Sequence, residues 1–188
     1  LEIKGKYADE RRTEIAIVED EIDIEDLIDE ETCIYTLTNA GYIKRMSLDT
    51  YAAQRRGGRG KRGMATREED FVETIFTAST HDNLLFFTNF GKVYCRKGYL
   101  IPEAGSAAKG TNIVNILPIE PGERVNAMIH GRGFPEDRYL MFVTRGGTVK
   151  RLRTSELRNI RKTGLRVLNL VDGDELISVR ETEGDDNI

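Results

Sequence analysis

From Thr32 onward, the chain consists of short runs in which apolar and β-branched residues dominate, separated by small polar turns that contain glycine. The first run, 33–38, is rich in residues that favour strands, and it is followed by Asn39-Ala40-Gly41 and a second run over 42–46. Two such runs joined by a short turn with glycine available for positive φ are typical of a β-hairpin. The pattern therefore predicts an antiparallel pair of strands at this point.

The same hairpin pattern recurs twice, over 85–96 and 141–152, with turn glycines at 41, 91 and 147. Each copy continues into a loop that ends at a glycine, and then into a strand, a polar turn and another strand. These second halves are expected as strands over 64–67 and 71–76, 111–117 and 124–129, and 165–171 and 175–179. Four short strands in each repeat of about 40–50 residues are typical of propeller blades.

The predicted fold class is therefore all-β, a propeller-like wheel with about three four-stranded blades over roughly 32–80, 81–138 and 139–180. A blade needs neighbours to bury its faces, and closed propellers use about four to eight blades. Two alternatives stay open: the ring continues beyond Ile188, or this is a partial wheel with an exposed edge. We favour the first.

The flanking segments differ from the repeats in composition. Residues 1–14 have helix-forming composition and are expected to be the end of a helical arm, a short remnant before the domain. Residues 15–31 are expected to be an acidic linker with an edge strand, and 181–188 an acidic loop between blades. For 15–31 a second interpretation is open, in which the acidic segment lies across a basic loop and competes with its partner.

The charge of the chain is unevenly distributed. The overall net charge is −4, but residues 1–31 carry −9, residues 32–180 carry +9 and residues 181–188 carry −4. A basic body is thus flanked by acidic segments, and the local field decides which partners are attracted. The overall acidity does not exclude a nucleic-acid partner.

The strongest local signal is the basic loop from Gln54 to Gly63. It packs five cations among four glycines with no acid: Gln54, Arg55, Arg56, Gly57, Gly58, Arg59 and Gly60, followed by Lys61, Arg62 and Gly63. Glycines let the backbone approach a partner closely, and charges of one sign need anions. A nucleic-acid backbone is the expected anion.

Further cations follow the same places in the repeats. The basic loop comes after a return strand, a place that 102–109 and 158–163 take in the later copies. Return strands and loops add the candidates Lys44, Arg45, Arg96, Lys97, Lys150, Arg151, Arg153, Arg158, Arg161 and Lys162. If the blades are equivalent, these cations recur around one rim, and a duplex that follows the rim is bent.

At this point the chain resembles a known family. Gln54–Gly60 matches the seven-residue box of the DNA gyrase A subunit, and nearly the whole chain resembles the C-terminal wrapping domain of that family. The resemblance implies a β-pinwheel, a wheel, usually of six blades, in which neighbouring blades exchange strands and which wraps double-stranded DNA. It also implies a place in an ATP-dependent type II topoisomerase, with a homodimer of A subunits and two B subunits, in the bacterial cytoplasm and not in a membrane.

Catalysis is expected to lie elsewhere in such an assembly. The family's cleavage tyrosine lies upstream of Leu1, so no residue here is expected to be catalytic. ATP and Mg²⁺ would be used elsewhere, and neither a cofactor nor a metal is expected in this segment. The alternative function is a protein-interaction propeller whose basic loop binds an acidic partner.

Overall fold

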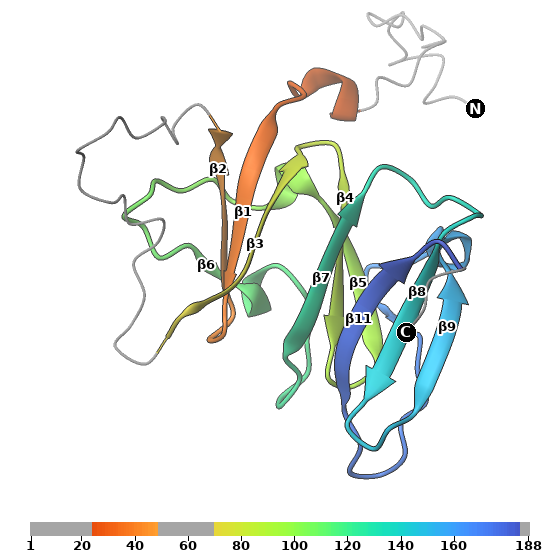
Figure 1. Cartoon of the computed structure of the whole chain (residues 1–188). Coiled ribbons are helices and arrows are strands. Elements are labelled where there is room, and N and C mark those ends of the chain that lie inside the picture. The colour runs from red at the N-terminus through yellow and green to blue at the C-terminus, as the bar shows by residue number, and fades with distance from the viewer. Residues whose placement is uncertain (1–23, 49–69, 185–188) are drawn as a thin grey trace, which may run out of the picture.

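The structure is a computed structural model that describes residues 24–48 and 70–184. It contains three antiparallel sheets that lie side by side (Figure 1). The predicted helix end at 1–14, the basic loop and the last residues, 185–188, fall outside the described residues. In the part of the chain that the structure describes, no helix is long and apolar enough to cross a membrane.

Each sheet is built on one predicted hairpin. Sheet 1 has the order β3 (Val72–Ser79), β1 (Thr32–Thr38), β2 (Tyr42–Ser47), β6 (Thr111–Asn112). Sheet 2 has the order β10 (Leu165–Arg166), β5 (Lys92–Lys97), β4 (Asn83–Thr88), β7 (Val125–Gly131). Sheet 3 has the order β11 (Leu176–Thr182), β8 (Tyr139–Thr144), β9 (Val149–Arg153).

Short 3₁₀ helices complete the described structure. They are η1 (Ile24–Leu27), η3 (Gly98–Leu100), η4 (Ile113–Asn115) and η5 (Thr154–Leu157). η3 and η5 directly follow β5 and β9, at the end of the hairpin where the chain leaves the sheet. The three turn glycines all have positive φ, at 80° for Gly41, 70° for Gly91 and 84° for Gly147, which is why glycine occupies these turns.

The fourth strand of a sheet comes from the next repeat. β6 pairs with β2 through Tyr42↔Asn112, and β10 pairs with β5 through Leu165↔Val93. The segments after these strands also bond to the turns of the preceding repeat, because Gly41 O accepts from Ile113 N and Gly91 O accepts from Val167 N. The exchange of strands implied by the family resemblance is therefore present in sheets 1 and 2.

The donated strands are shorter than predicted. The expected strand over 111–117 is a strand for two residues only, and then η4 begins, where the Asn112 side chain accepts from Val114 N. The expected strand over 165–171 likewise ends at Arg166. Alternation alone could not reveal this, because the apolar residues here are buried by packing against the neighbouring sheet rather than by a continuing ladder.

The two flanking expectations differ in outcome. Residues 24–31 contain η1 and no strand, while 15–23 lie outside the described residues, so the edge strand expected within 15–31 stays a prediction. β11 runs to Thr182 and pairs Glu181↔Leu140 and Thr182↔Tyr139, so the first residues of the expected acidic loop are strand.

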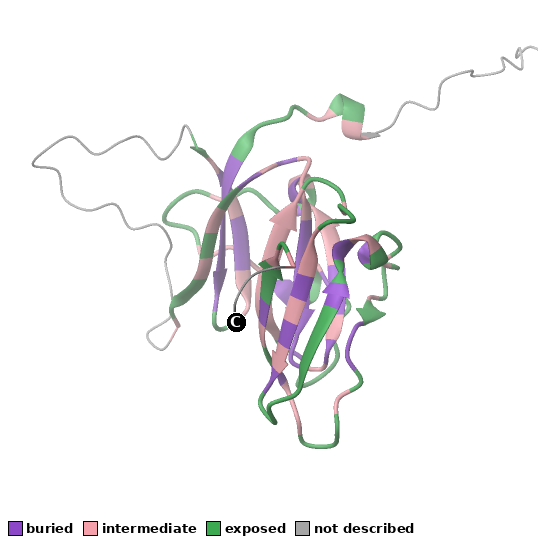
Figure 2. Cartoon of the chain, turned by 45° about the vertical axis from the view of Figure 1, so that its right-hand side comes forward, coloured by how far each residue is buried: buried purple, intermediate pink, exposed green. Residues whose placement is uncertain are grey.

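Two cores lie between the three sheets. Leu84 and Phe86 of β4 pack towards sheet 1, while Leu85 and Phe87 of the same strand pack towards sheet 3. β4 is buried on both faces for this reason and lacks a polar face. β8 instead alternates buried and half-buried residues along its length (Figure 2). Sheet 2 is thus the middle layer, because its residues contribute to both cores.

Candidate nucleic-acid interface

The predicted rim lies where the return strands β2, β5 and β9 end. In sheet 1 the register Cys33↔Ser47 places the start of β1 beside the end of β2. The box residues Gln54–Gly60, with Lys61 and Arg62, fall outside the described residues, and their role stays a prediction. The described residues do test where the remaining candidate cations lie.

Lys44 is a buried cation. Its side chain is on β2 with 0% exposure, and its ammonium donates to Gly105 O at 2.8 Å, Ala108 O at 3.0 Å and Ser106 O at 3.2 Å. Carbonyl oxygens satisfy the charge, while burial lowers the Lys44 pKa. The expectation that Lys44 lies on an exposed rim is therefore wrong; it holds the loop between β5 and β6 against sheet 1.

Arg45 serves the same loop from the next position. Its Nε donates to Ile101 O at 2.9 Å, and its guanidinium lies 3.6 Å from a Glu103 carboxylate and 3.3 Å from that of Glu31. The side chain is only 17% exposed. Arg45 is thus partly buried, and it links sheet 1 to the loop that contains Ile101 and Glu103 and to Glu31 just before β1.

The two candidates of sheet 2 are also engaged. Arg96 donates to its neighbour's carbonyl, Cys95 O, at 2.8 Å and to Ile116 O at 3.3 Å. Lys97 Nζ lies 2.8 Å from Glu25 Oε1 and donates to His81 O at 3.2 Å. Arg96 therefore stabilises the segment after η4, while Lys97 pairs with a carboxylate at the surface.

Sheet 3 exposes its cations more fully than the other sheets. Lys150, Arg151 and Arg153 lie on β9, which is exposed apart from Leu152. Lys150 donates to Val167 O at 2.7 Å, and the guanidinium carbons of Arg151 and Arg153 lie 4.7 and 5.8 Å from the centre of the Tyr139 ring. These cations keep exposed surface for a partner.

The loop after β9 carries the last three candidates. Arg158 donates to Phe134 O and lies 3.3 Å from Glu136, both weak exposed contacts. Arg161 and Lys162 are exposed. They occupy the place in repeat 3 that the basic loop takes in repeat 1, so they are the described residues that best match the predicted rim.

Residues that the sequence did not single out complete the charged surface. Arg132, after β7, is 66% exposed and lies 2.7 Å from Glu30. That pairing and a hydrogen bond from Ser79 lower the Glu30 pKa, and Glu30 in turn raises the Arg132 pKa. No sequence signal marks Arg132, because its partner is more than a hundred residues away along the chain.

A metal-dependent site finds no support in the described ranges. Across 24–48 and 70–184, no group of three His, Cys, Asp or Glu side chains is placed to hold a metal ion. Cys33 and Cys95 are free, and burial raises the pKa of each thiol.

Comparison with known proteins agrees with the fold. The family model "DNA gyrase C-terminal domain, beta-propeller" matches residues 34–79, 82–130 and 138–183. The chain is also similar in structure to the C-terminal domain of DNA topoisomerase IV, with a TM-score of 0.72 and 31% identity over 84% of this chain and 47% of that one. A DNA gyrase A C-terminal domain gives a TM-score of 0.62 and 26% identity over 81% of this chain and 48% of that one.

Curated relatives match over the whole chain. The DNA gyrase A subunit of Clostridium acetobutylicum is 56% identical over 187 residues, which is 100% of this chain and 22% of the relative. The same subunit of Halalkalibacterium halodurans is 50% identical over 188 residues, 100% of this chain and 23% of the relative. The chain therefore spans less than a quarter of the length of these relatives. With all three repeats matched, this chain belongs to the DNA gyrase C-terminal domain family of β-propellers.

Proposed function

We propose that this chain binds double-stranded DNA along its cationic rim and bends it, as a non-catalytic part of a DNA gyrase A subunit. In that assembly it would work with the rest of an A-subunit homodimer and with B subunits that use ATP and Mg²⁺, in the cytoplasm. DNA held in a curve would be presented for strand passage, which would introduce negative supercoils. The observation that carries the proposal is the family match across three repeats together with the box Gln54–Gly60 in the first.

The charge pattern supports a backbone contact rather than base recognition. Arg151, Arg153, Arg161 and Lys162 are exposed on or after β9, and the basic loop occupies the matching place after β2. Each phosphate that the protein neutralises releases condensed counterions. It therefore contributes about −0.9 to the slope of the logarithm of the binding constant against the logarithm of salt concentration. Four contacts in repeat 3 would thus add about −3.6 to this slope.

Two measurements test the proposal. In the first, nicked circles are closed by ligase in the presence of the intact chain, and linking number is measured. A shift in linking number is expected if the chain wraps DNA with a single handedness. In the second, binding to a short duplex is titrated with salt; a slope near zero would refute contact with the phosphates.

The box is tested in the full gyrase. Replacing Gln54–Gly60 with alanines is expected to abolish supercoiling while ATP-dependent relaxation and decatenation survive. The comparison variant is Arg161→Ala/Lys162→Ala, which removes two proposed rim contacts from repeat 3 and leaves the box intact, so it separates the loss of the box from the loss of rim charge. Normal supercoiling by the box variant would show that the box has no part in wrapping.

A second function is favoured by one observation. Lys97 and Arg132 already bind carboxylates of this chain, so the surface can accept acidic protein segments. A protein-interaction propeller with an acidic partner is the corresponding alternative. The salt titration separates the two, because a duplex bound through several phosphates loses affinity steeply with salt.

A further inference from the structure

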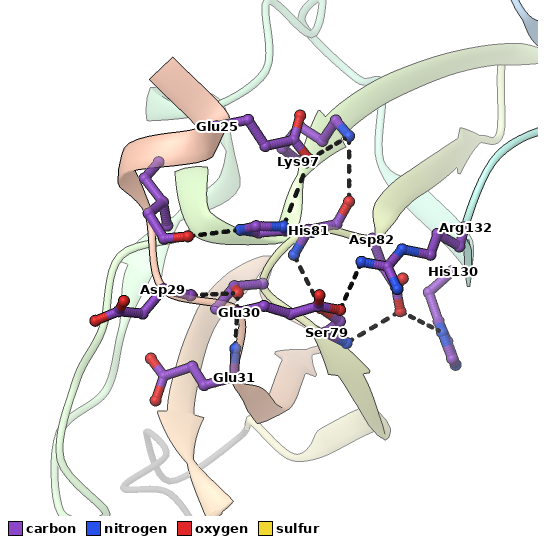
Figure 3. A network of polar contacts seen from close by, with 12 residues as sticks. Glu25, Asp29, Glu30, Glu31, Ser79, His81, Asp82, Lys97, His130 and Arg132 are labelled. Atoms are coloured by element: carbon purple, nitrogen blue, oxygen red, sulfur yellow. Dashed lines mark hydrogen bonds and ion pairs between the residues drawn. The ribbon is translucent and has the colours of Figure 1, made fainter. Parts of the chain in front are cut away.

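Residues 24–31, which we call the acidic strap, lie across one end of sheets 1 and 2 (Figure 3). The strap consists of η1 and the segment from Ile28 to Glu31 that leads into β1. It carries five carboxylates and no cation: Glu25, Asp26, Asp29, Glu30 and Glu31. Negative charge is therefore concentrated at this end of sheets 1 and 2.

The strap carboxylates pair with cations of both sheets. Glu25 Oε1 lies 2.8 Å from Lys97 Nζ, and Glu30 Oε1 lies 2.7 Å from an Arg132 nitrogen. Glu31 Oε1 lies 3.3 Å from Arg45, whose other contacts hold it in the loop junction. Lys97 and Arg132 are thus the cations whose charge the strap chiefly covers.

The main chain of the strap is anchored separately from these carboxylates. Thr80, which is 1% exposed, donates from its hydroxyl to Asp29 O at 3.0 Å and accepts from Glu31 N at 3.1 Å. Thr80 N donates to Glu31 O at 2.9 Å, and the His81 ring contacts Ile28 O at 2.8 Å. Because these contacts hold the backbone from Ile28 to Glu31, the glutamate side chains are not needed to dock that segment.

Lys97 and Arg132 lie on either side of one central strand. Asn83 pairs with Lys97 on one side and with Gly131 on the other, so the two cations flank the start of β4. The main chains of β5 and β7 are two strand spacings apart, about 10 Å. Both side chains reach carboxylates of the strap, so the two cations belong to one surface.

The covered cations lie at the end of the sheets where the basic loop departs. Glu31 directly precedes β1, and the register Cys33↔Ser47 puts that point beside the end of β2. The box follows β2 in the sequence, and Lys97 ends β5 at the equivalent place in sheet 2. A polyanion drawn to this end would meet the strap.

We propose that Lys97 and Arg132 form a second phosphate-binding surface, and that the strap carboxylates of Glu25 and Glu30 occupy it and keep DNA from it in the unsubstituted chain. The carboxylates stand where phosphates bind, so DNA must displace them to gain both contacts. The inference rests on the proposed function and adds to it a regulatory contact and Arg132 as a DNA-binding residue. The strap backbone stays docked on Thr80 when its carboxylates are displaced.

The test uses the intact chain and a short duplex in a salt titration. Glu25→Gln/Glu30→Gln is compared with Glu73→Gln/Asp172→Asn, which removes the same charge from two exposed positions, one on β3 and one in the turn before β11. We expect the strap variant to bind at least about tenfold more tightly near 0.1 M salt and to have a slope more negative by about 1.8, from two added phosphate contacts. The control is expected to show only the small uniform gain of a changed net charge.

The same strap substitutions are then made in a chain that lacks the two cations, to show whether the gain in affinity depends on them. In Lys97→Gln/Arg132→Gln, neutralising the strap is expected to give no gain beyond that of the control, because the contacts it uncovers are gone. The single variant Glu30→Gln, at a 45% exposed side chain, repeats the test with half of the slope change and little demand on folding. Circular dichroism and thermal unfolding confirm that each variant is folded.

The outcomes separate the two proposals. If the unsubstituted chain binds DNA with a steep slope and the strap variant matches its control, the second surface is refuted and the proposed function stands. A gain that persists without Lys97 and Arg132 also refutes it. A slope near zero in every variant refutes the proposed function itself.

Discussion

Lys44 offers the sharpest test of how this chain divides its cations between structure and DNA. Lys44→Met keeps the length and most of the volume of the side chain but removes its charge and all three donated hydrogen bonds. Hydrogen bonds to charged groups contribute about 1.5–3 kcal/mol each in mutational series. The cost of burying the ammonium, several kcal/mol, disappears with it. We expect a net loss of about 2–4 kcal/mol in the free energy of unfolding.

The assay pairs this variant with one of opposite expected behaviour. Urea unfolding measures stability, and a salt titration at a temperature where all variants are folded measures phosphate contacts. Lys44→Met is expected to lose stability and keep the slope of the parent. Arg161→Ala/Lys162→Ala is expected to keep stability within about 0.5 kcal/mol and to lose about 1.8 of slope. A stable Lys44→Met with a slope shallower by about 0.9 would show that Lys44 contacts phosphate and would refute its structural role.

Three further substitutions test the packing that positions the rim. Gly91→Ala places a Cβ at 2.8 Å from Leu168 O at a φ of 70°, so we expect a loss of about 2–4 kcal/mol by urea unfolding; a loss under about 1 kcal/mol would contradict the close approach of the donated segment. Tyr94 has its pKa raised from 10.0 to about 12 by burial and by Glu123, so its contribution is complete below pH 10 and is lost as pH rises towards 12. Tyr94→Phe should therefore flatten the decline of stability between pH 10 and 12, and an unchanged decline would exclude Tyr94 as its source. Glu123→Ala leaves the Thr88 and Tyr94 hydroxyls without their buried acceptor and should cost about 2–4 kcal/mol in thermal unfolding, whereas Glu120→Ala, at a 60% exposed side chain, should cost under about 1 kcal/mol.

The hairpins could be predicted from sequence because their determinants are local. Alternation of apolar residues and the glycines at 41, 91 and 147 specify strand, turn and strand within about fifteen residues. The donated strands β6 and β10 could not be delimited in this way. Their length depends on Gly41 O and Gly91 O in the preceding repeat, which lie some 70 residues away in sequence.

The same distinction explains which candidate cations are exposed, as the sequence predicted, and which are buried. Arg161 and Lys162 lie in a loop, where local composition is a fair guide to exposure. Lys44 lies on a strand whose side chain meets a loop from the next repeat, so neither its charge nor its position along the strand reveals its burial. Arg132 pairs with the strap only because the repeats bring the two together, and the composition of either segment alone predicts a solvated charge.

The exchange of strands has a consequence for cooperativity. Because β10 is covalently part of repeat 3 but hydrogen-bonded in sheet 2, melting the third repeat would also strip an edge from the second. A boundary drawn between repeats therefore never coincides with a boundary between sheets, and excising one repeat damages two. We expect the three sheets to unfold in a single transition rather than one after another, and their edges to hold their spacing while a bent duplex strains against them.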